Sequence, residues 1–356
     1  MRDAGPAELR LTLAPRRRFE AIDVNRRIAE QAGDVLRRYQ RAFYCSFHTT
    51  AGYLDQSLSA RLRHDRDGLS QFFGSFNTLF PQGGDYRHDR MELRAELSEA
   101  QREIEPRNAD SHLTFIGAGL RNSVTYRTQP EAPVYFIDLD GTSDAMQRRR
   151  MTTVVAYDVE RVVARTSVSI PVSKHPIDSV NLADPRLGLL DHVNDLLARS
   201  GLEKGRVDLL VEASEHNVGL TVNEYETLLM QHDLVDVLKD PLRFAKIKTR
   251  HMLDDPLAIP GKTLNYAKYD VVRVLNSLME ALRLDQSSFE RLVAKVMAVP
   301  ARRFLRSRRV SFLAAADVDH AAARLIRGAY QSPILVQWQP AEQQVRRLEI
   351  ALVQLS

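Results

Sequence analysis

The strongest fold signal in this chain is the stretch RAFYCSFHTTAG at residues 41–52. It begins with a short apolar run of the length that is typical of a buried β-strand. The run ends at His48, and a Thr-Thr pair and a small-residue turn follow. The stretch therefore predicts a strand whose end presents polar side chains, which is where rigid scaffolds commonly carry functional groups.

A second stretch, RVDLLVEASEHNVGL from Arg206, has the same outline and contains His216 at the equivalent place. A His-Asp pair follows each histidine at the same spacing, at residues 64–65 and 232–233, so the two stretches are offset by 168 residues. A fixed offset between similar segments is the signature of an internal repeat, and chance similarity of short segments is the alternative.

The ends of the two halves also match, at a larger common offset of 197 residues. HLTFIGAG at residues 112–119 aligns with RVSFLAAA at 309–316. QRRRMTTVVAYD at 147–158 aligns with QVRRLEIALVQL at 344–355. The difference between the two offsets predicts that the second half carries an insertion of roughly 30 residues.

We therefore expect two domains. The first spans residues 1–158, and the second is a diverged copy at residues 167–356 with a helical insertion at about 240–302. The linker is expected at residues 158–168, and because it is not rich in Gly or Ser, the two halves should pack together.

Periodicity predicts an α+β fold. Strands are expected at residues 9–13, 43–47, 113–116, 134–139 and 152–156, helices at 24–39 and 57–73, and a turn at 82–85. The connections are short, which favours antiparallel pairing over βαβ units.

Composition excludes several classes of protein. The chain has 356 residues, of which 44% are hydrophobic and 27% charged, with a net charge of +4. Cys45 is the only cysteine, so an intrachain disulfide and a multi-thiolate zinc site are excluded. No apolar run reaches the length of a membrane span and no leader is recognisable, so a cytoplasmic protein is expected.

Arginines cluster at residues 16–18, 148–150 and 302–309. Such clusters could hold phosphates, although a solvated face is the commoner reason for them. No nucleic-acid-binding motif accompanies them, so nucleic acid is not an expected partner.

Three histidines, His48, His88 and His112, lie at expected strand ends and turns. Three neutral imidazoles can bind a divalent metal and leave one position open. Three carboxylates could orient these imidazoles, namely Asp65, Asp89 and Asp110. A hydrogen-bonded structural residue is the alternative for each histidine.

These histidines also carry a resemblance. HTTAG at residues 48–52, YRHD at 86–89 and DSHL at 110–113, with a later strand ending in Asp-Gly, resemble the YjbQ family, also called UPF0047. The resemblance covers the first half strongly and, through the repeat, the second half weakly. It implies two mainly antiparallel β-sandwich domains with flanking helices, in a chain that assembles, with a trimer favoured.

The resemblance also implies functional residues. His48, His88 and His112 would bind a divalent metal ion, most simply zinc, with manganese and magnesium as alternatives. Thr49 and Thr50 would line the same pocket.

The family's Asn-Glu pair is replaced by Asp55 and Gln56 in the first half and is present as Asn223 and Glu224 in the second. A composite site is therefore one hypothesis, with Glu224 and Arg309 completing the first half's histidines. A second half kept for packing is the other. The assigned roles are catalytic for Thr49, Asp65 and Glu224, and substrate-binding for Thr50 and Arg309.

Some family members are assigned a thiamine-phosphate synthase activity. The resemblance thus implies a metal-dependent transferase that acts on a small phosphorylated or anionic metabolite, in this or a specialised biosynthetic form. The alternative is a non-catalytic module that recruits a partner protein.

Overall fold

The structure is a computed structural model that describes residues 5–129, 132–143, 146–239, 244, 247, 305, 307–317 and 320–356. The chain divides into two compact units. Unit 1 consists of Met1–Gln56, Leu120–Glu224 and Arg306–Ser356, and unit 2 consists of Ser57–Gly119 and Tyr225–Leu305.

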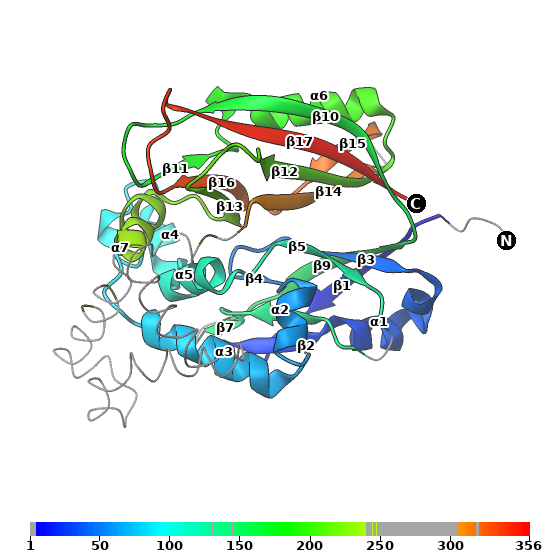
Figure 1. The fold of residues 1–356 in the computed structure, drawn as a ribbon. Helices are drawn as coiled ribbons and strands as arrows, with labels where there is room; N and C mark the ends of the chain where they lie inside the picture. Colours follow the sequence, from blue (N-terminus) through cyan, green and yellow to red (C-terminus); the bar gives the residue numbers. More distant parts are fainter. Residues whose placement is uncertain are drawn as a thin grey trace, which may run out of the picture. The chain divides into compact units, whose positions relative to one another are not determined.

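Unit 1 holds the β-strands of both halves of the chain (Figure 1). In the first half, one antiparallel sheet has the order β1 (Ala7–Leu13), β9 (Arg150–Tyr157), β3 (Arg41–Ser46) and β5 (Ser123–Arg127). A smaller sheet has the order β2 (Glu20–Asp23), β6 (Tyr135–Asp138) and β4 (Ala51–Gly52), and a short hairpin pairs β7 (Thr142–Ser143) with β8 (Met146–Gln147).

In the second half, the larger sheet has the order β10 (Glu160–Pro171), β17 (Val345–Leu355), β12 (Lys204–Val211), β14 (Arg309–Asp317) and β15 (His320–Ile326). The smaller sheet has the order β11 (Asp178–Asn181), β16 (Ser332–Gln337) and β13 (Val218–Asn223). Apart from the edge strand β15 in the second half and the β7–β8 hairpin in the first, the described strands have the same order in the two halves.

One helix per half covers these sheets within unit 1. Helix α1 (Val24–Ala32) begins at the N-cap Asp23, whose side chain accepts a hydrogen bond from Arg26 N. It is followed by the 3-10 turn η1 (Val35–Arg38). In the second half, the turn η3 (Pro185–Leu187) leads into α6 (Leu189–Ser200), which ends at Gly201 in the left-handed conformation that glycine adopts readily.

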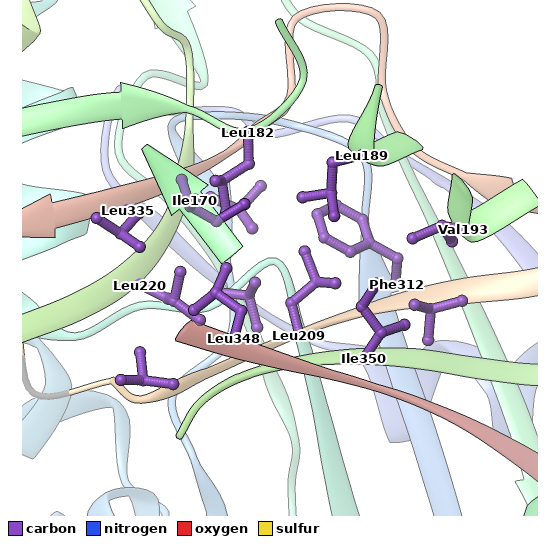
Figure 2. Close-up of a cluster of buried hydrophobic side chains, with 14 of the residues drawn as sticks. Ile170, Leu182, Leu189, Val193, Leu209, Leu220, Phe312, Leu335, Leu348 and Ile350 are labelled. Carbon is purple, nitrogen blue, oxygen red and sulfur yellow. The ribbon is translucent and has the colours of Figure 1, made fainter. Parts of the chain in front are cut away.

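Each half has its own apolar core. In the second half, α6 contributes Leu189 and Val193 to a cluster with strand residues such as Leu209 and Ile350 (Figure 2). A third cluster joins the two larger sheets, because Phe43, Cys45, Val155 and Tyr157 pack with Leu313, Val353 and Leu355. The expected packing of the two halves against each other is therefore confirmed within unit 1.

Unit 2 is helical. Its described elements are α2 (Gln56–Arg61, whose first residue belongs to unit 1), α3 (Arg66–Leu79), η2 (Met91–Leu93), α4 (Glu99–Ile104), α5 (Ala109–Ala118), the π-helical turn η4 (Leu229–Asp233) and α7 (Leu234–Lys239). The expected single helix at 57–73 is interrupted, because Arg63 and His64 have positive φ angles of 59° and 50°. Asp65 then caps α3 by accepting from Asp67 N.

Two local expectations are wrong. Residues 113–116 are not a strand, since they lie within helix α5 and are buried almost throughout. An apolar run of this length suits a buried strand and a buried helix equally, so periodicity alone does not separate them. The expected linker at 158–168 is mostly β10, which pairs along its length with β17.

The remaining expected strands at 9–13, 43–47, 134–139 and 152–156 are confirmed. The expected helical insertion at 240–302 lies almost entirely outside the described residues. The compact units do not follow the boundary near residue 158, since each unit takes segments from both halves. A repeat boundary there stays a prediction. None of the described helices is long and apolar enough to cross a membrane.

Candidate functional site

A buried polar cluster in unit 2 is centred on His88, whose residue is 0% exposed. Its Nδ1 lies 3.0 Å from Glu226 Oε2, and its Nε2 lies 3.4 Å from Asn108 Oδ1. The ring of His112, on helix α5, meets the His88 ring edge-on at a centroid distance of 5.3 Å. His88 and His112 come from the first half of the chain and Glu226 from the second, so the cluster is built by both.

Backbone hydrogen bonds hold the partners of His88 in place. Glu226 accepts from the N–H groups of Leu228 and Leu229, each at 2.7 Å, at the start of the helical segment that contains η4. Asp233 Oδ2 accepts from His88 N at 3.0 Å. Carboxylates fixed in this way cannot swing away, so the geometry of the His88–Glu226 pair is preorganised.

The pKa shifts of the two groups favour the charged form of the pair. Burial opposes the charged form of His88, but the hydrogen bond with Glu226 and the negative charge of Asp89 outweigh it and raise the pKa of His88 above its usual range. Burial likewise opposes the carboxylate, and the bonds from His88, Leu228 and Leu229 outweigh it and lower the pKa of Glu226. The two directions agree on an imidazolium–carboxylate pair.

Asp89 lies next to this pair and behaves differently. Its Oδ1 accepts from Ala109 N at 3.0 Å, at the N-terminus of α5. Burial, together with the charges of Asp110 and Asp233, raises the pKa of Asp89 to about 7 although the His88 charge lowers it. Titratable groups with shifted pKa values concentrate at functional sites, which makes this cluster the first candidate.

The cluster alone does not provide the three histidine ligands of the expected metal site. A catalytic zinc site takes three protein ligands, and a carboxylate on the far nitrogen of a histidine is its usual support. Glu226 gives His88 such support, and His112 is a second imidazole, but His48 belongs to unit 1. Among the described residues no group of three or more His, Cys, Asp or Glu side chains is arranged to hold a metal ion.

A second polar centre lies in unit 1, around Arg150 at the start of β9. Its guanidinium donates to both carboxylate oxygens of Asp138, at 2.7 and 2.8 Å. It also donates to Thr50 Oγ1 at 3.2 Å and to the carbonyl of Asp140 at 3.0 Å. A buried bidentate pair of this kind fixes the ends of β6 and β9 and positions Thr50.

His48 lies beside this centre. Its Nε2 accepts from Met151 N at 2.8 Å. Burial, followed by the nearby charges of Arg150 and Arg148, lowers the pKa of His48 to about 3. His48 is therefore neutral at physiological pH, and a backbone donor occupies its Nε2.

The second half repeats this centre with other side chains. Arg346, at the start of β17, donates to Gln337 Oε1 at 3.3 Å and to the carbonyl of Gln339 at 2.6 Å, as Arg150 does to Asp138 and the carbonyl of Asp140. The local architecture is thus shared, while the carboxylate partner is replaced by an amide.

The counterpart of His48 in this centre is Glu215, one residue before the expected His216. Glu215 Oε1 accepts from Arg347 N at 2.9 Å, as His48 accepts from Met151 N. The other oxygen, Oε2, pairs with Arg346 at 2.9 Å. In the second half, an internal ion pair therefore takes the place of the histidine.

The structure places the other expected site residues as follows. Thr49 presents its carbonyl to Asn223 Nδ2 at 3.2 Å, and Glu224 N donates to Asn223 Oδ1 at 2.8 Å, all within unit 1. Asp65 is the N-cap of α3 in unit 2. Arg309 begins β14, and its Nη1 lies 3.9 Å from Asp208 Oδ2.

The alignment of His112 with Arg309 is wrong, because the first lies on a helix and the second on a strand. Sequence reasoning also missed Glu226, the acid that contacts His88. The sequence held a nearby indication of this residue, because Glu226 lies two residues after the expected Glu224 in the run NEYE at residues 223–226.

Comparisons with known proteins give matches to solved structures at low TM-scores. No protein-family profile and none of the curated proteins matches the sequence. A YbjQ-like protein of unknown function from Sulfolobus solfataricus matches in structure with a TM-score of 0.26 and 13% identity, over 55% of this chain and 99% of the other.

Two further solved structures give similar values. An uncharacterised conserved protein of the YjbQ/UPF0047 family from Clostridium acetobutylicum matches with a TM-score of 0.27 and 12% identity, over 52% of this chain and 98% of the other. A hypothetical protein from Aeropyrum pernix matches with a TM-score of 0.27 and 15% identity, over 53% and 97%. At these TM-scores the likeness says nothing about function.

Proposed function

We propose that this chain is an enzyme that acts on a small phosphorylated or otherwise anionic metabolite, with the His88–Glu226 pair as its proton-transfer group. The observation that carries the proposal is the pair itself. A fully buried imidazole at 3.0 Å from a carboxylate that two backbone amides hold in place is the arrangement of an oriented general acid or base.

The roles within the pair follow from its protonation. Glu226 accepts a hydrogen bond from the Nδ1–H of His88 and so stabilises the imidazolium. The proton on Nε2 is then the one available for transfer. Nε2 now faces Asn108 Oδ1 at the long distance of 3.4 Å. The oxygen of a substrate leaving group would take the place of that amide oxygen and receive the Nε2 proton as its bond to the transferred group breaks and the attacking substrate bonds to that group, which returns His88 to its neutral form.

We further propose that the chain arose by tandem duplication of a YjbQ-like domain. The repeated strand order and the matching Arg150 and Arg346 centres support this origin. The second half would be a non-catalytic copy, because an ion pair between Arg346 and Glu215 fills its equivalent of the His48 centre. The second half would then have no site of its own and would contribute Glu226 to the site of the first half. This is a composite site in which Glu226 replaces the expected Glu224.

The family resemblance gives the reaction to test first, which is thiamine-phosphate synthase-like transfer, with a specialised biosynthetic derivative as its variant. The assay is formation of thiamine phosphate, followed by turnover of a panel of small phosphate esters. We expect His88→Gln and Glu226→Gln to lower kcat by at least about 100-fold, the usual contribution of a general acid or base.

The matched control is His175→Gln, which removes an exposed histidine of unit 1. It should keep full activity. Wild-type activity that persists in both His88→Gln and Glu226→Gln, with folding intact, would rule out the proposed pair.

A non-catalytic module that recruits a partner protein is the second candidate. Two exposed apolar side chains of unit 2 favour it, Ile104 at 78% and Leu93 at 48% exposure. Such a module would show no turnover on any substrate, and Ile104→Asp would abolish capture of its partner without changing the melting temperature.

The remaining expectations are proposals as well. As the alternative to proton transfer by His88, a divalent metal, zinc before manganese or magnesium, would use the neutral imidazoles of His48, His88 and His112. Assembly into a homo-oligomer, with a trimer favoured, is testable by light scattering of the purified chain.

A further inference from the structure

Two arginine triplets that lie far apart in the sequence, residues 16–18 and 148–150, run beside each other in unit 1. The pairing of β1 with β9 sets Leu13 opposite Arg150, and the chain then continues past both strands. Gln147 Nε2 donates to the carbonyl of Pro15 at 2.8 Å, which ties the two segments together beyond the sheet.

Gly141 fixes this approach. A Cβ there would lie 2.5 Å from Pro15 Cβ and 2.6 Å from the carbonyl oxygen of Arg17, so only glycine fits. Its N–H donates to the carbonyl of Arg18 at 2.8 Å, and its own carbonyl accepts from Arg148 N at 3.0 Å. The backbone that carries both triplets is therefore held by close packing and hydrogen bonds rather than left as loose loops.

Asp140 orients two of the arginines. It is 1% exposed, accepts from Arg148 Nη2 at 2.7 Å and lies 3.5 Å from Arg18 Nη1. One carboxylate thus serves two guanidinium groups. Arg150 is already matched by Asp138, so the excess positive charge stays on the Arg18–Arg148 side.

The other three arginines, Arg16, Arg17 and Arg149, are exposed. Among the described residues no side-chain hydrogen bond or ion pair involves their guanidinium groups. A guanidinium presents a planar set of donors that matches phosphate oxygens, and several on adjacent segments can share one phosphate group.

We propose that this arginine patch, formed by Arg16, Arg17, Arg18, Arg148 and Arg149, binds the phosphate or diphosphate group of a small molecule. The group that binds is expected to be compact and to carry two or three negative charges. The arginine patch consists of two short segments of chain. The carboxylate of Glu20, which accepts a hydrogen bond from Arg16 N, lies next to it. A nucleic acid would need a longer basic stripe that contacts successive phosphates, so it is the less suitable ligand.

The test is calorimetric titration of the full chain with inorganic diphosphate, at low and at physiological salt. The triple variant Arg16→Ala, Arg17→Ala, Arg149→Ala should raise Kd by about tenfold or more, since charge-assisted hydrogen bonds are lost. The triple lysine variant keeps the charge and should lose part of the affinity, because lysine cannot bind bidentately.

The matched control is the triple variant Arg38→Ala, Arg61→Ala, Arg127→Ala, which removes the same charge from three exposed positions elsewhere. It should change Kd by less than about twofold, because distant exposed charges are screened. An equal loss in both triples, or no diphosphate binding by the wild type at millimolar concentration, would overturn the proposal.

Two further arms separate the alternatives. Tighter binding of a single-stranded RNA oligonucleotide than of diphosphate, lost in the same triple variant, would identify a nucleic-acid surface and overturn the small-phosphate assignment. His88→Gln should bind diphosphate as the wild type does. Failure of the proton-transfer pair and failure of the arginine patch are thus distinguishable.

Discussion

His88 and Glu226 lie 138 residues apart in the chain and 3.0 Å apart in space. Each is ordinary in its local sequence. Together they form a buried charged pair, and removing one partner of such a pair is costly because the other is left unmatched, by about 3–5 kcal/mol in comparable cases. The activity test on His88→Gln and Glu226→Gln therefore needs a folding control.

The raised pKa of Asp89 makes the stability of the protein depend on pH. Since the folded-state pKa of about 7 lies above the ordinary aspartate value of 3.8, the folded protein binds the extra proton between these values. Stability from this group is therefore present at low pH and lost as pH rises through about 7. Asp89→Asn should raise the melting temperature at pH 8, and by less at pH 5, where the folded protein still binds the proton that the unfolded chain has already lost.

Asn keeps an acceptor for Ala109 N, so the cap of α5 is preserved in that variant. Asp67→Asn, at an exposed position on α3, is the control and should shift the melting temperature equally at both pH values. A melting temperature of Asp89→Asn that falls further below wild type at pH 8 than at pH 5 would show that the carboxylate is ionised and needed.

At the scale of elements, the local sequence decides where helices begin. Asp65 interrupts the predicted helix at 57–73 because it caps α3, and the strained residues Arg63 and His64 precede it. Gly68, in the first turn of α3, allows close packing, since a Cβ there would lie 2.8 Å from the carbonyl oxygen of Leu62.

The cap gives Asp65 a structural reason to be where it is. Asp65→Ala should lower the stability by about 1 kcal/mol, as the loss of an N-cap does. Asp65→Asn should restore most of it, because Asn also caps helices. If Asp65 instead acts in catalysis, Asp65→Asn would lose activity while keeping its melting temperature, and turnover measured beside thermal denaturation separates the two roles.

At the scale of the whole molecule, both halves supply strands to unit 1 and helical segments to unit 2. Gly328, from the second half, approaches the first so closely that a Cβ would lie 1.9 Å from the carbonyl oxygen of Phe47. Gln331 Nε2 donates to the carbonyls of Ser46 and His48, at 2.9 Å each. The halves are interlocked within unit 1, so either half expressed without the other should be insoluble, as measured by the soluble fraction after expression.

The metal content of the purified chain distinguishes the two hypotheses about its histidines. The three-histidine hypothesis, which is the alternative to the proton-donor role of His88, predicts about one tightly held divalent metal per chain and the loss of that metal in His112→Gln. Elemental analysis of the purified protein, with His175→Gln as the control, provides the measurement. No metal in the wild type, even after addition of zinc or manganese, would contradict the three-histidine hypothesis and leave the His88–Glu226 pair as the source of the chemistry.

The sequence by itself determined the features that depend on near neighbours. The strands around residues 43–47 and 152–156 and the turn at 82–85 follow from local periodicity and turn chemistry. The arginine triplets and the position of His48 after its strand were equally readable, because they depend on consecutive residues, whereas His112 lies within helix α5 rather than at the start of a strand.

Only the tertiary structure decided the rest. Residues 113–116 are helical because they are buried within the helical unit 2, which no local pattern specifies. Glu226 rather than Glu224 meets His88, and Glu215 rather than His216 stands where His48 does, because strand register and helix capping set those contacts. A shift of one or two residues is invisible to a repeat alignment, yet it decides which side chain faces which, since neighbouring residues point to different sides of a strand or helix.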